Sequence, residues 1–591
     1  MAAFVAPARG EALMEIAGAM DALPAASTAT DAGPCAWPRV VTCRAHAPRH
    51  RPRPGDGGVG GLARIRRCLE PKIPRMLRCL PMALLPLLPA ATACAATTVI
   101  DRVMIVDGTG APAYAGAVRI ADGRIVAVGR LRPAPGEPRV DGRGLVLAPG
   151  FIDTHSHHDA GMFERPDMAT VTSQGVTTLI VGQDGFSQTP LASLFERLQA
   201  NPLAVNLGSY SGHNTLRAQV LGTDARRPAS EREIAGMSRL LEADMEAGAF
   251  GLSTGLMYEP GAFSTTEEVV ALAQVAARRG GRYISHVRNE AFELDSAIDE
   301  AILVGRRTGM PVQISHLKIA VRKRWGQADA ILRKLDQARA EGIDLSADVY
   351  PYTYWQTTMR IMFPNKDYDD RRGLAFNFAE STPPEELRVA LFRPDPSLQG
   401  RSIAQIAQAR GQDPVTAYIG MEKTLAAYER THASELELGK VEAVIGTSMS
   451  EDDVATFLRW PHSNVCSDGF ELGHPRGHGT FTRVLGRYVR ERGVLSLEQA
   501  VHRMTGLAAA HLGITDRGVI RPGAWADLVL FDPDTVADRA TLENPAAQSV
   551  GIAQVWVAGQ TVFAAGHALP ARPGQVVRRQ GDAPFTAVAA H

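Results

Sequence analysis

The chain has 591 residues, with 63 Lys and Arg against 63 Asp and Glu, and 45% of its residues are hydrophobic. This length allows one large catalytic domain and a smaller one, and the hydrophobic content is sufficient for a buried core. Because the charges balance, no overall electrostatic field draws the chain to nucleic acid or to an anionic membrane. We therefore expect a small-molecule ligand.

Residues 1–75 are rich in Pro, Ala, Gly and Arg and lack sustained apolar periodicity, so we expect no fold there. At Met76 the pattern changes, because Arg78 precedes an apolar run that begins at Leu80 and small residues follow it. That order predicts a secretory signal peptide over residues 76–95. The simplest reading is a true start at Met76 after an overextended gene start; the alternative is a disordered leader before a hydrophobic strand.

A signal peptide implies export, to the periplasm or the medium. The run is too short to span a bilayer, which needs about 20 apolar residues. Ala91 to Cys94 also loosely resembles a lipobox, which would make Cys94 the site of a lipid anchor. After processing, Cys466 would remain with or without a lipidated Cys94, so we expect no disulfide framework.

Both ends of the remaining chain show a sequence pattern of short β-strand segments separated by turns that contain Gly and Asp. These segments are residues 96–147 and 516–575, and residues 576–591 follow as a tail. Two β-rich ends around a long α/β middle predict a small β-sandwich domain built from both ends of the chain.

The middle, residues 148–515, alternates apolar strand candidates with helical stretches, which is typical of parallel strands. Eight strand candidates suit a (β/α)8 TIM barrel. They lie at residues 147–153, 177–182, 203–208, 249–253, 282–285, 312–315, 344–350 and 464–467. The last interval is far longer than the others and predicts an insertion over residues 353–440 at the barrel mouth.

Ligand-type residues follow four of these strands, at the barrel face where catalytic groups gather. Residues two apart on a strand point the same way, so His155 and His157 can reach one metal ion. A lone His at a strand end is usually structural, but imidazole and carboxylate converging at one rim suit Zn²⁺. The converging residues are His155, His157, His286, His316 and Asp468.

The segment from Ala148 to His157, Ala-Pro-Gly-Phe-Ile-Asp-Thr-His-Ser-His, resembles the signature of the amidohydrolase superfamily. Further segments resemble its D-aminoacylase branch, the N-acyl-D-amino-acid deacylases, across residues 98–570. They begin at Gly175, Gly251, Ser285, Ile314, Asp348, Ser467, His474 and Met504. The resemblance implies hydrolysis of the amide of N-acyl-D-amino acids with one or two zinc ions.

The resemblance also implies roles for individual residues. His286 and His316 would hold the tightly bound zinc, while His155, His157 and Asp468 would form a weaker position, with Asp468 as the general base. This chain departs from the family pattern Gly-Asn-Cys-Gly, because it reads Gly-Gln-Asp-Gly over residues 182–185. Asp184 stands where the family has a Cys ligand, so it either binds the metal directly or hydrogen-bonds a ligand histidine.

A deacylase must hold the free α-carboxylate of its substrate with cationic or hydroxyl donors. The candidates are Tyr258, Arg288, Lys318 and Tyr350. Arg288 and Lys318 each follow a ligand histidine by two residues, which places them on the same face if the strand continues. His213, His474 and His478 are either further site residues or structural ones.

Two other functions remain open. One is an amidohydrolase that acts on a cyclic amide or an isoaspartyl dipeptide. Enzymes of the dihydroorotase and hydantoinase types usually bridge their two metal ions with a carboxylated Lys, and no Lys stands at a predicted strand end in that role here. The other is a non-catalytic binding protein on the same barrel, which should lack the general base. The side chain and acyl group of the substrate are not evident from the sequence.

Overall fold

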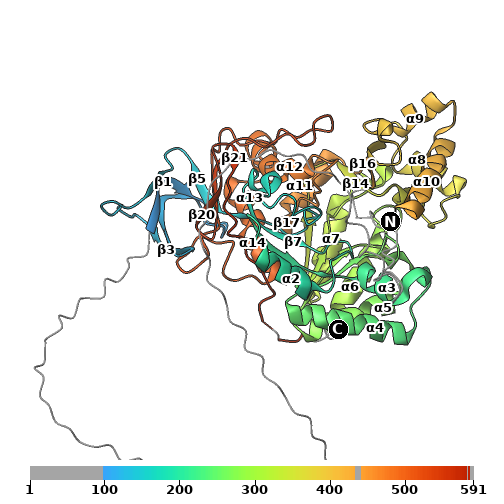
Figure 1. Ribbon diagram of the computed structural model, residues 1–591, viewed down its shortest axis with the longest axis horizontal. Coiled ribbons are helices and arrows are strands. Elements are labelled where there is room, and N and C mark those ends of the chain that lie inside the picture. Colours follow the sequence, from blue (N-terminus) through green and yellow to red (C-terminus); the bar gives the residue numbers. More distant parts are fainter. Residues whose placement is uncertain (1–96, 433–440, 582, 586–591) are drawn as a thin grey trace, which may run out of the picture. The chain divides into compact units, whose positions relative to one another are not determined.

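The computed structural model describes residues 97–432, 441–581 and 583–585 (Figure 1). The expected leader, the signal peptide over residues 76–95 and Cys94 lie outside these residues. Across the described ranges, no helix combines the length and apolarity that crossing a membrane requires.

Parallel strands form the centre of the molecule, in two sheets that continue one another. Only Tyr210 separates β8 from β9, so the two occupy one strand position and the barrel has eight in all. The expected (β/α)8 barrel is confirmed. Its strands are β6 (Phe151–Asp153), β7 (Val176–Val181), β8 (Asn206–Ser209), β9 (Ser211–Gly212), β10 (Gly251–Gly255), β11 (Arg282–His286), β12 (Val312–Ile314), β13 (Leu345–Val349) and β17 (Ser463–Val465).

Backbone hydrogen bonds join the first and last strand positions just beyond their C-terminal ends. The amide of Asp468 donates to the carbonyl of His155 at 2.9 Å, and the amide of His157 donates to the carbonyl of Gly469 at 3.0 Å. The segments that carry the ligand-type residues of β6 and β17 are therefore bonded directly to each other.

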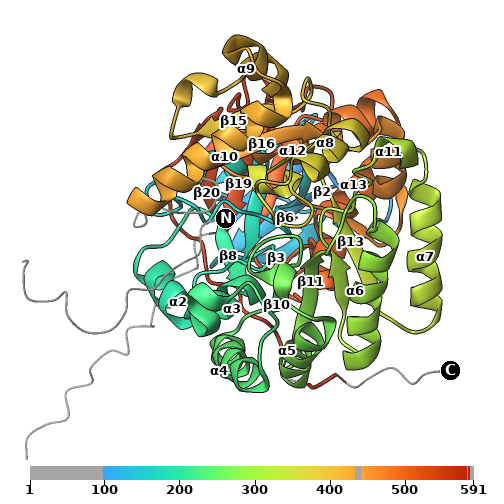
Figure 2. The same cartoon turned by 90° about the vertical axis from the view of Figure 1, so that its right-hand side faces the viewer.

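Amphipathic helices surround the strands, and Figure 2 shows α4 to α7 in a row outside β10, β11 and β13. Local sequence fixes where they begin: Ser230 and Glu233 form a reciprocal capping box at α4, and Thr265 caps α5. The barrel helices are α1 (Ala169–Thr172), α2 (Leu191–Ala200), α3 (His213–Leu221), α4 (Glu231–Ala247), α5 (Thr266–Arg278), α6 (Leu294–Thr308), α7 (Ala328–Ala340), α11 (Glu451–Arg459), α12 (Arg476–Arg483), α13 (Leu497–Met504) and α14 (Gly506–Leu512).

Strands from both ends of the chain pair in one nine-stranded sheet, where Figure 1 shows blue and red strands side by side. The two ends meet where β5 pairs antiparallel with β18. The expected domain is thus organised around a single hydrogen-bonded sheet. Its strands are β1 (Thr97–Ile105), β2 (Tyr114–Ala121), β3 (Arg124–Gly129), β4 (Arg139–Asp141), β5 (Val146–Pro149), β18 (Leu528–Phe531), β19 (Ile552–Val557), β20 (Gln560–Ala564) and β21 (His567–Ala568).

The first barrel strand is shorter than expected. Residues 147–153 were expected to form one strand, but Val146–Pro149 belongs to the nine-stranded sheet and only Phe151–Asp153 to the barrel. Gly150 lies at the break, and a Cβ there would come within 2.2 Å of the Thr177 side chain. The chain passes between the two domains where there is no room for a side chain.

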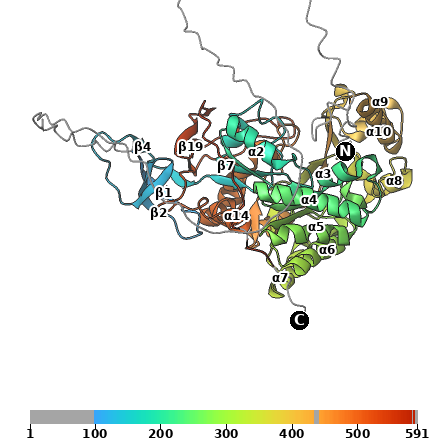
Figure 3. The same ribbon diagram turned by 60° about the horizontal axis from the view of Figure 1, so that its bottom comes forward.

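The insertion is a compact unit with its own antiparallel sheet, in the order β14-β16-β15. A separate hydrophobic core that includes Trp355, Phe363 and Tyr418 holds it together. The expected insertion over residues 353–440 continues through β16 to Thr447, and Figure 3 shows its helices grouped together. Its elements are β14 (Tyr354–Thr357), α8 (Arg371–Glu380), β15 (Arg388–Phe392), α9 (Ile403–Arg410), α10 (Pro414–Thr431) and β16 (Glu442–Thr447).

Residues 576–581 and 583–585 of the expected tail run along the barrel. The amide of Val577 donates to the carbonyl of Leu207 at 2.8 Å, and the amide of Arg579 donates to that of Gly248 at 3.0 Å. Gly248 precedes β10, so this segment covers the barrel end opposite the strand ends that carry the ligand-type residues.

Candidate metal centre and active site

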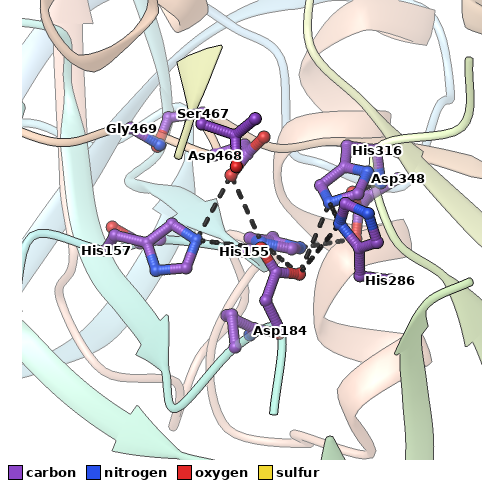
Figure 4. A network of polar contacts seen from close by, with 12 residues as sticks. His155, His157, Asp184, His286, His316, Asp348, Ser467, Asp468 and Gly469 are labelled. Atoms are coloured by element: carbon purple, nitrogen blue, oxygen red, sulfur yellow. Dashed lines mark hydrogen bonds and ion pairs between the residues drawn. The ribbon is translucent and has the colours of Figure 1, made fainter. Parts of the chain in front are cut away.

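Six buried side chains gather at the C-terminal ends of the barrel strands in two adjoining groups (Figure 4). Within each group, the potential ligand atoms lie within 4.8 Å of one another, close enough for one metal ion. The structure therefore brings together every residue that the sequence predicted as a ligand. The first group is His155, His157, Asp184 and Asp468, and the second is Asp184, His286 and His316.

Asp184 belongs to both groups. Its Oδ2 lies 3.3 Å from Nε2 of His157, while its Oδ1 lies 3.4 Å from Nε2 of His316 and 3.4 Å from Nε2 of His155. Figure 4 shows its carboxylate between the histidines of the two groups. The side chain that replaces the family's Cys thus has an oxygen directed at each group.

The donor set fits a cation. Among the described residues, Oδ1 of Asp184 and Nε2 of His155 are buried without a hydrogen-bond partner. Buried polar atoms normally have a partner, and lacking one costs about 1–3 kcal/mol. Histidine nitrogen and carboxylate oxygen together are zinc donors, so a bound metal ion would satisfy both atoms.

Three of these residues have a left-handed backbone, which non-glycine residues rarely adopt. The φ angles are 54° at Asp184, 35° at His316 and 46° at Asp468. Such strain costs of order 1–3 kcal/mol per residue and concentrates at functional sites. Gly255 relieves crowding beside Asp184, because a Cβ there would lie 2.0 Å from the Asp184 carbonyl oxygen.

Two buried carboxylates orient the histidines from behind. Oε1 of Glu290 lies 3.0 Å from Nδ1 of His316, and Oδ2 of Asp348 lies 3.8 Å from Nδ1 of His155. Nζ of Lys318 lies 2.7 Å from the same Nδ1 and donates to Glu290 at 2.6 Å, so an ammonium and a carboxylate together fix this side of the His316 ring while its Nε2 faces Asp184. Neither carboxylate could be assigned a role from the sequence, although each lies in a segment that resembles the family.

Arg476 is a third residue whose role was not evident from the sequence. Its Nη1 lies 2.7 Å from Oδ2 of Asp468, and the side chain is buried. Burial alone would raise the pKa of Asp468, but Arg476 and the nearby histidines outweigh burial and hold that pKa well below its usual range. The carboxylate of Asp468 is therefore ionised at neutral pH. The sequence feature that could have identified Arg476 is its position in the family-like segment that begins at His474.

A pocket opens in front of both groups, and the barrel and the insertion both contribute to it. From the barrel come ligand residues, Lys318, Tyr258 and Arg476; from the insertion come residues of β14, α8, α10 and β16. Oγ1 of Thr357 donates to the hydroxyl of Tyr258 at 2.9 Å, which ties the insertion to the barrel wall. The insertion thus forms part of the candidate site.

Of the four candidates for binding a substrate carboxylate, Lys318 and Tyr258 line this pocket. Tyr350 lies behind it, where Lys318 and Arg476 contact its ring at 5.7 Å and 4.6 Å, and burial raises its pKa to about 12. Burial lowers the pKa of Lys318, but Glu290, 2.6 Å away, outweighs this and raises it, so the ammonium stays charged.

The expectation for Arg288 is wrong. Its Nε and Nη2 donate to Glu300, each at 2.8 Å, and it is not among the residues that line the pocket. The strand that carries His286 ends at that residue, so the alternation of side chains does not extend to Arg288. Arg288 is a structural ion-pair residue.

The three histidines that the sequence left open have structural contacts. Nε2 of His213 lies 2.9 Å from Oε1 of Glu268, and Nε2 of His474 lies 2.9 Å from the carbonyl of Tyr354. Nε2 of His478 lies 3.1 Å from the carbonyl of Glu471. None of the three belongs to the two ligand groups within the described residues.

Known proteins share both the sequence and the fold. The N-acyl-D-glutamate deacylase of Alcaligenes xylosoxydans xylosoxydans is 38% identical over 82% of this chain and 97% of its own length. The D-aminoacylase of the same organism is 36% identical over 78% of this chain and 93% of its own length. The structure of N-acyl-D-glutamate deacylase from Bordetella bronchiseptica, with zinc and a phosphonate inhibitor that mimics the tetrahedral intermediate, matches with a TM-score of 0.71 at 37% identity and covers 81% of this chain and 99% of that one.

The family model described as "Amidohydrolase family" matches residues 139–563, which include the whole barrel and the insertion. The matched range also contains all six potential ligands. Together with the identity to the relatives over most of their length, this match shows that the chain belongs to the amidohydrolase family, in its D-aminoacylase branch.

Proposed function

We propose that this protein is a zinc-dependent hydrolase that cleaves the amide of N-acyl-D-amino acids, giving a carboxylic acid and a free D-amino acid. The observation that carries this proposal is the shared carboxylate of Asp184 between two ligand groups, beside a pocket with the cations Lys318 and Arg476. The similarity to an N-acyl-D-glutamate deacylase and to a D-aminoacylase supports the same reaction.

His155, His157, Asp184, His286, His316 and Asp468 would hold one or two zinc ions. Bound zinc supplies Lewis acidity for the amide carbonyl and lets water lose a proton near neutral pH. The residues behind the ligands fix their orientation. Glu290 contacts the ring of His316, and the carboxylate of Asp348 accepts a hydrogen bond from the backbone amide of His316 at 2.6 Å.

Asp468 is the proposed proton carrier. Its carboxylate is ionised and acceptor-only, so it can take a proton from the attacking water and return it to the nitrogen of the leaving amine. Arg476 holds Oδ2 of this carboxylate, which leaves Oδ1 toward His155 and His157, at 3.5 Å and 3.3 Å. The guanidinium therefore positions the base as well as keeping it ionised.

The free α-carboxylate of the substrate needs cationic and hydroxyl donors next to the reacting amide. We assign this role to Lys318 and Arg476, with Tyr258 as a hydroxyl donor; all three line the pocket. Both cations contact the ring of Tyr350, which therefore holds them on the same side of the site.

The test is a panel of N-acetyl-D-amino acids and N-acetyl-L-amino acids with zinc-loaded protein. The D-substrates should be hydrolysed in preference to the L-substrates, a chelator should abolish the reaction, and added Zn²⁺ should restore it. A hydantoin, a dihydropyrimidine and an isoaspartyl dipeptide belong in the same panel. Hydrolysis of these compounds without hydrolysis of any N-acetyl-D-amino acid would overturn the proposal.

We also propose that the protein is exported, to the periplasm or the medium, on the basis of the signal-peptide pattern over residues 76–95. N-terminal sequencing of the native protein tests this. A mature start near Ala95 supports cleavage, a lipidated Cys94 supports an anchor, and any residue before Met76 contradicts the start site.

A further inference from the structure

The part of the pocket that the insertion contributes has a composition of its own. We call it the insertion subsite and define it by Trp355, Thr358, Ile361, Met362, Glu429 and Glu442. These residues come from β14, the turn after it, α10 and β16. A substrate group that extends from the reacting amide into this half of the pocket meets these side chains.

Glu442 has no counter-cation in the part of the chain that the structure describes. Its carboxylate accepts hydrogen bonds from the hydroxyl of Thr358 and, at 2.9 Å, from the amide of Met359. No Lys, Arg or His of the described ranges makes an ion pair with it. The two neutral donors fix the position of this negative charge without cancelling it.

The second carboxylate of the insertion subsite is only partly neutralised. Nη2 of Arg360 lies 2.7 Å from Glu429, but the same guanidinium also lies 2.8 Å from Glu422, which is buried. One cation thus serves two carboxylates. Of these groups only Glu429 lines the pocket, so with Glu442 two carboxylates face it from the insertion.

The two cations that line the pocket within the described residues belong to its other side. Lys318 is bound to Glu290 at 2.6 Å and lies beside His316, and Arg476 is bound to Asp468 at 2.7 Å. In the proposed function they receive the α-carboxylate of the substrate. A second carboxylate, on the substrate's side chain, would therefore face Glu442 and Glu429 with no cation to receive it.

The remaining surface of the insertion subsite is apolar. Trp355 and Met362 belong to the separate core of the insertion, and Ile361 packs against that core. All three also line the pocket, and Met257 adds an apolar side chain from the barrel. Such walls favour the methylene stem of a long side chain, because removing apolar surface from water is favourable. The negative charge of Glu442 complements a positive charge at the end of such a stem.

We infer that the insertion subsite selects N-acyl-D-amino acids with a long side chain that ends in a cation, of the D-lysine or D-arginine type, and rejects those with acidic side chains. This inference rests on the proposed function. The inferred side-chain preference differs from that of two relatives, which are named for N-acyl-D-glutamate and N-acyl-D-aspartate and are 38% and 36% identical to this chain. Glu442 is the residue to which the structure assigns this specificity.

The experiment measures kcat/KM of zinc-loaded protein for N-acetyl-D-lysine, N-acetyl-D-methionine, N-acetyl-D-glutamine and N-acetyl-D-glutamate. The isosteric glutamine and glutamate pair isolates charge. We expect glutamine to exceed glutamate by at least about tenfold and lysine to exceed methionine, because like charges repel and opposite charges attract across a partly desolvated pocket. In Glu442→Gln, both ratios should move toward one.

Glu385→Gln is the matched control, because Glu385 is exposed, lies on the same insertion and does not line the pocket. Its two ratios should equal those of the wild type. Equal or better hydrolysis of glutamate than of glutamine overturns the inference, as does a Glu442→Gln protein with unchanged ratios. N-succinyl-D-methionine and N-butyryl-D-methionine test whether the acyl group, and not the side chain, faces the insertion subsite. If kcat/KM falls for the charged acyl group while the two side-chain ratios stay near one, the inference is also overturned. Failure to hydrolyse any N-acyl-D-amino acid instead overturns the proposed function.

Discussion

Nη1 of Arg476 lies 2.7 Å from Oδ2 of Asp468, and Oδ1 of the same carboxylate lies 3.3 Å from Nε2 of His157. One oxygen is thus held by a buried guanidinium and the other faces the ligand group. Because a guanidinium cannot lose its proton in a protein, Asp468 is kept ionised and fixed in direction.

Asp468→Asn should reduce the chemical step more than substrate binding. Asparagine keeps the shape of the side chain but cannot accept the proton of water. General acid–base groups contribute about 10²–10⁴-fold, so kcat should fall at least about a hundredfold while KM changes much less. Steady-state kinetics at saturating zinc, with metal content measured in parallel, check this. A near-normal kcat would remove Asp468 from the mechanism.

Asp184→Asn should weaken metal retention, because Asp184 has an oxygen directed at each ligand group. The loss of affinity should exceed the roughly 10–100-fold that removing a residue behind a ligand typically costs. Glu290→Gln provides that comparison, since Glu290 contacts His286, His316 and Lys318 but belongs to neither ligand group. Zinc stoichiometry after dialysis, and titration with a chelator, give the affinities.

Asp184→Cys restores the residue that the family has at this position, and it should retain zinc with appreciable activity. An Asp184→Asn protein with wild-type stoichiometry and affinity would show that Asp184 only hydrogen-bonds a ligand histidine.

Lys318→Met should weaken the preference for a free α-carboxylate, because one of the two assigned cations is lost, whereas Arg288→Met should keep it. Lys318 lines the pocket, and Arg288 is bound to Glu300 instead. Hydrogen bonds to charged groups contribute about 1.5–3 kcal/mol, so kcat/KM for N-acetyl-D-methionine should fall about 10–100-fold in Lys318→Met. The ratio of kcat/KM between this substrate and its α-carboxamide isolates the effect from metal loss. A ratio that changes equally in both variants contradicts the assignment.

Glu268 should make the stability of the protein depend on pH. It is buried, and although burial raises its pKa, His213 and Arg217 outweigh burial and lower it. A lowered folded-state pKa means that the unfolded chain binds more protons as the pH falls. Its contribution is therefore present above the unfolded pKa of about 4.3 and is lost as the pH drops through the folded pKa.

Glu268→Gln checks this dependence. Leaving Arg217 as a buried charge without its partner should cost about 3–5 kcal/mol near pH 7. Urea unfolding at a series of pH values should show the gap between wild type and variant shrinking in acid. A gap that stays constant from pH 7 to pH 3 would show that the effect is packing and not charge.

The pattern of residues along the chain was sufficient to predict the barrel and its ligand histidines. Buried parallel strands carry apolar runs, and their C-terminal ends meet at one face, so His155, His157, His286 and His316 could be placed together from strand ends alone. The β texture at both ends of the chain similarly predicted a shared domain, which β5 and β18 confirm by pairing.

Tertiary structure decided the direction of every side chain beyond a strand end. Arg288 follows His286 by two residues, yet the strand stops at His286 and Arg288 turns to Glu300. Arg476 lies on a helix after β17 and reaches Asp468 only because the loop between them folds back. Asp184 serves both ligand groups because its left-handed backbone directs the carboxylate between them. Side-chain alternation holds only inside a strand, and beyond it the backbone torsions of loops, fixed by packing against distant segments, determine what each residue contacts.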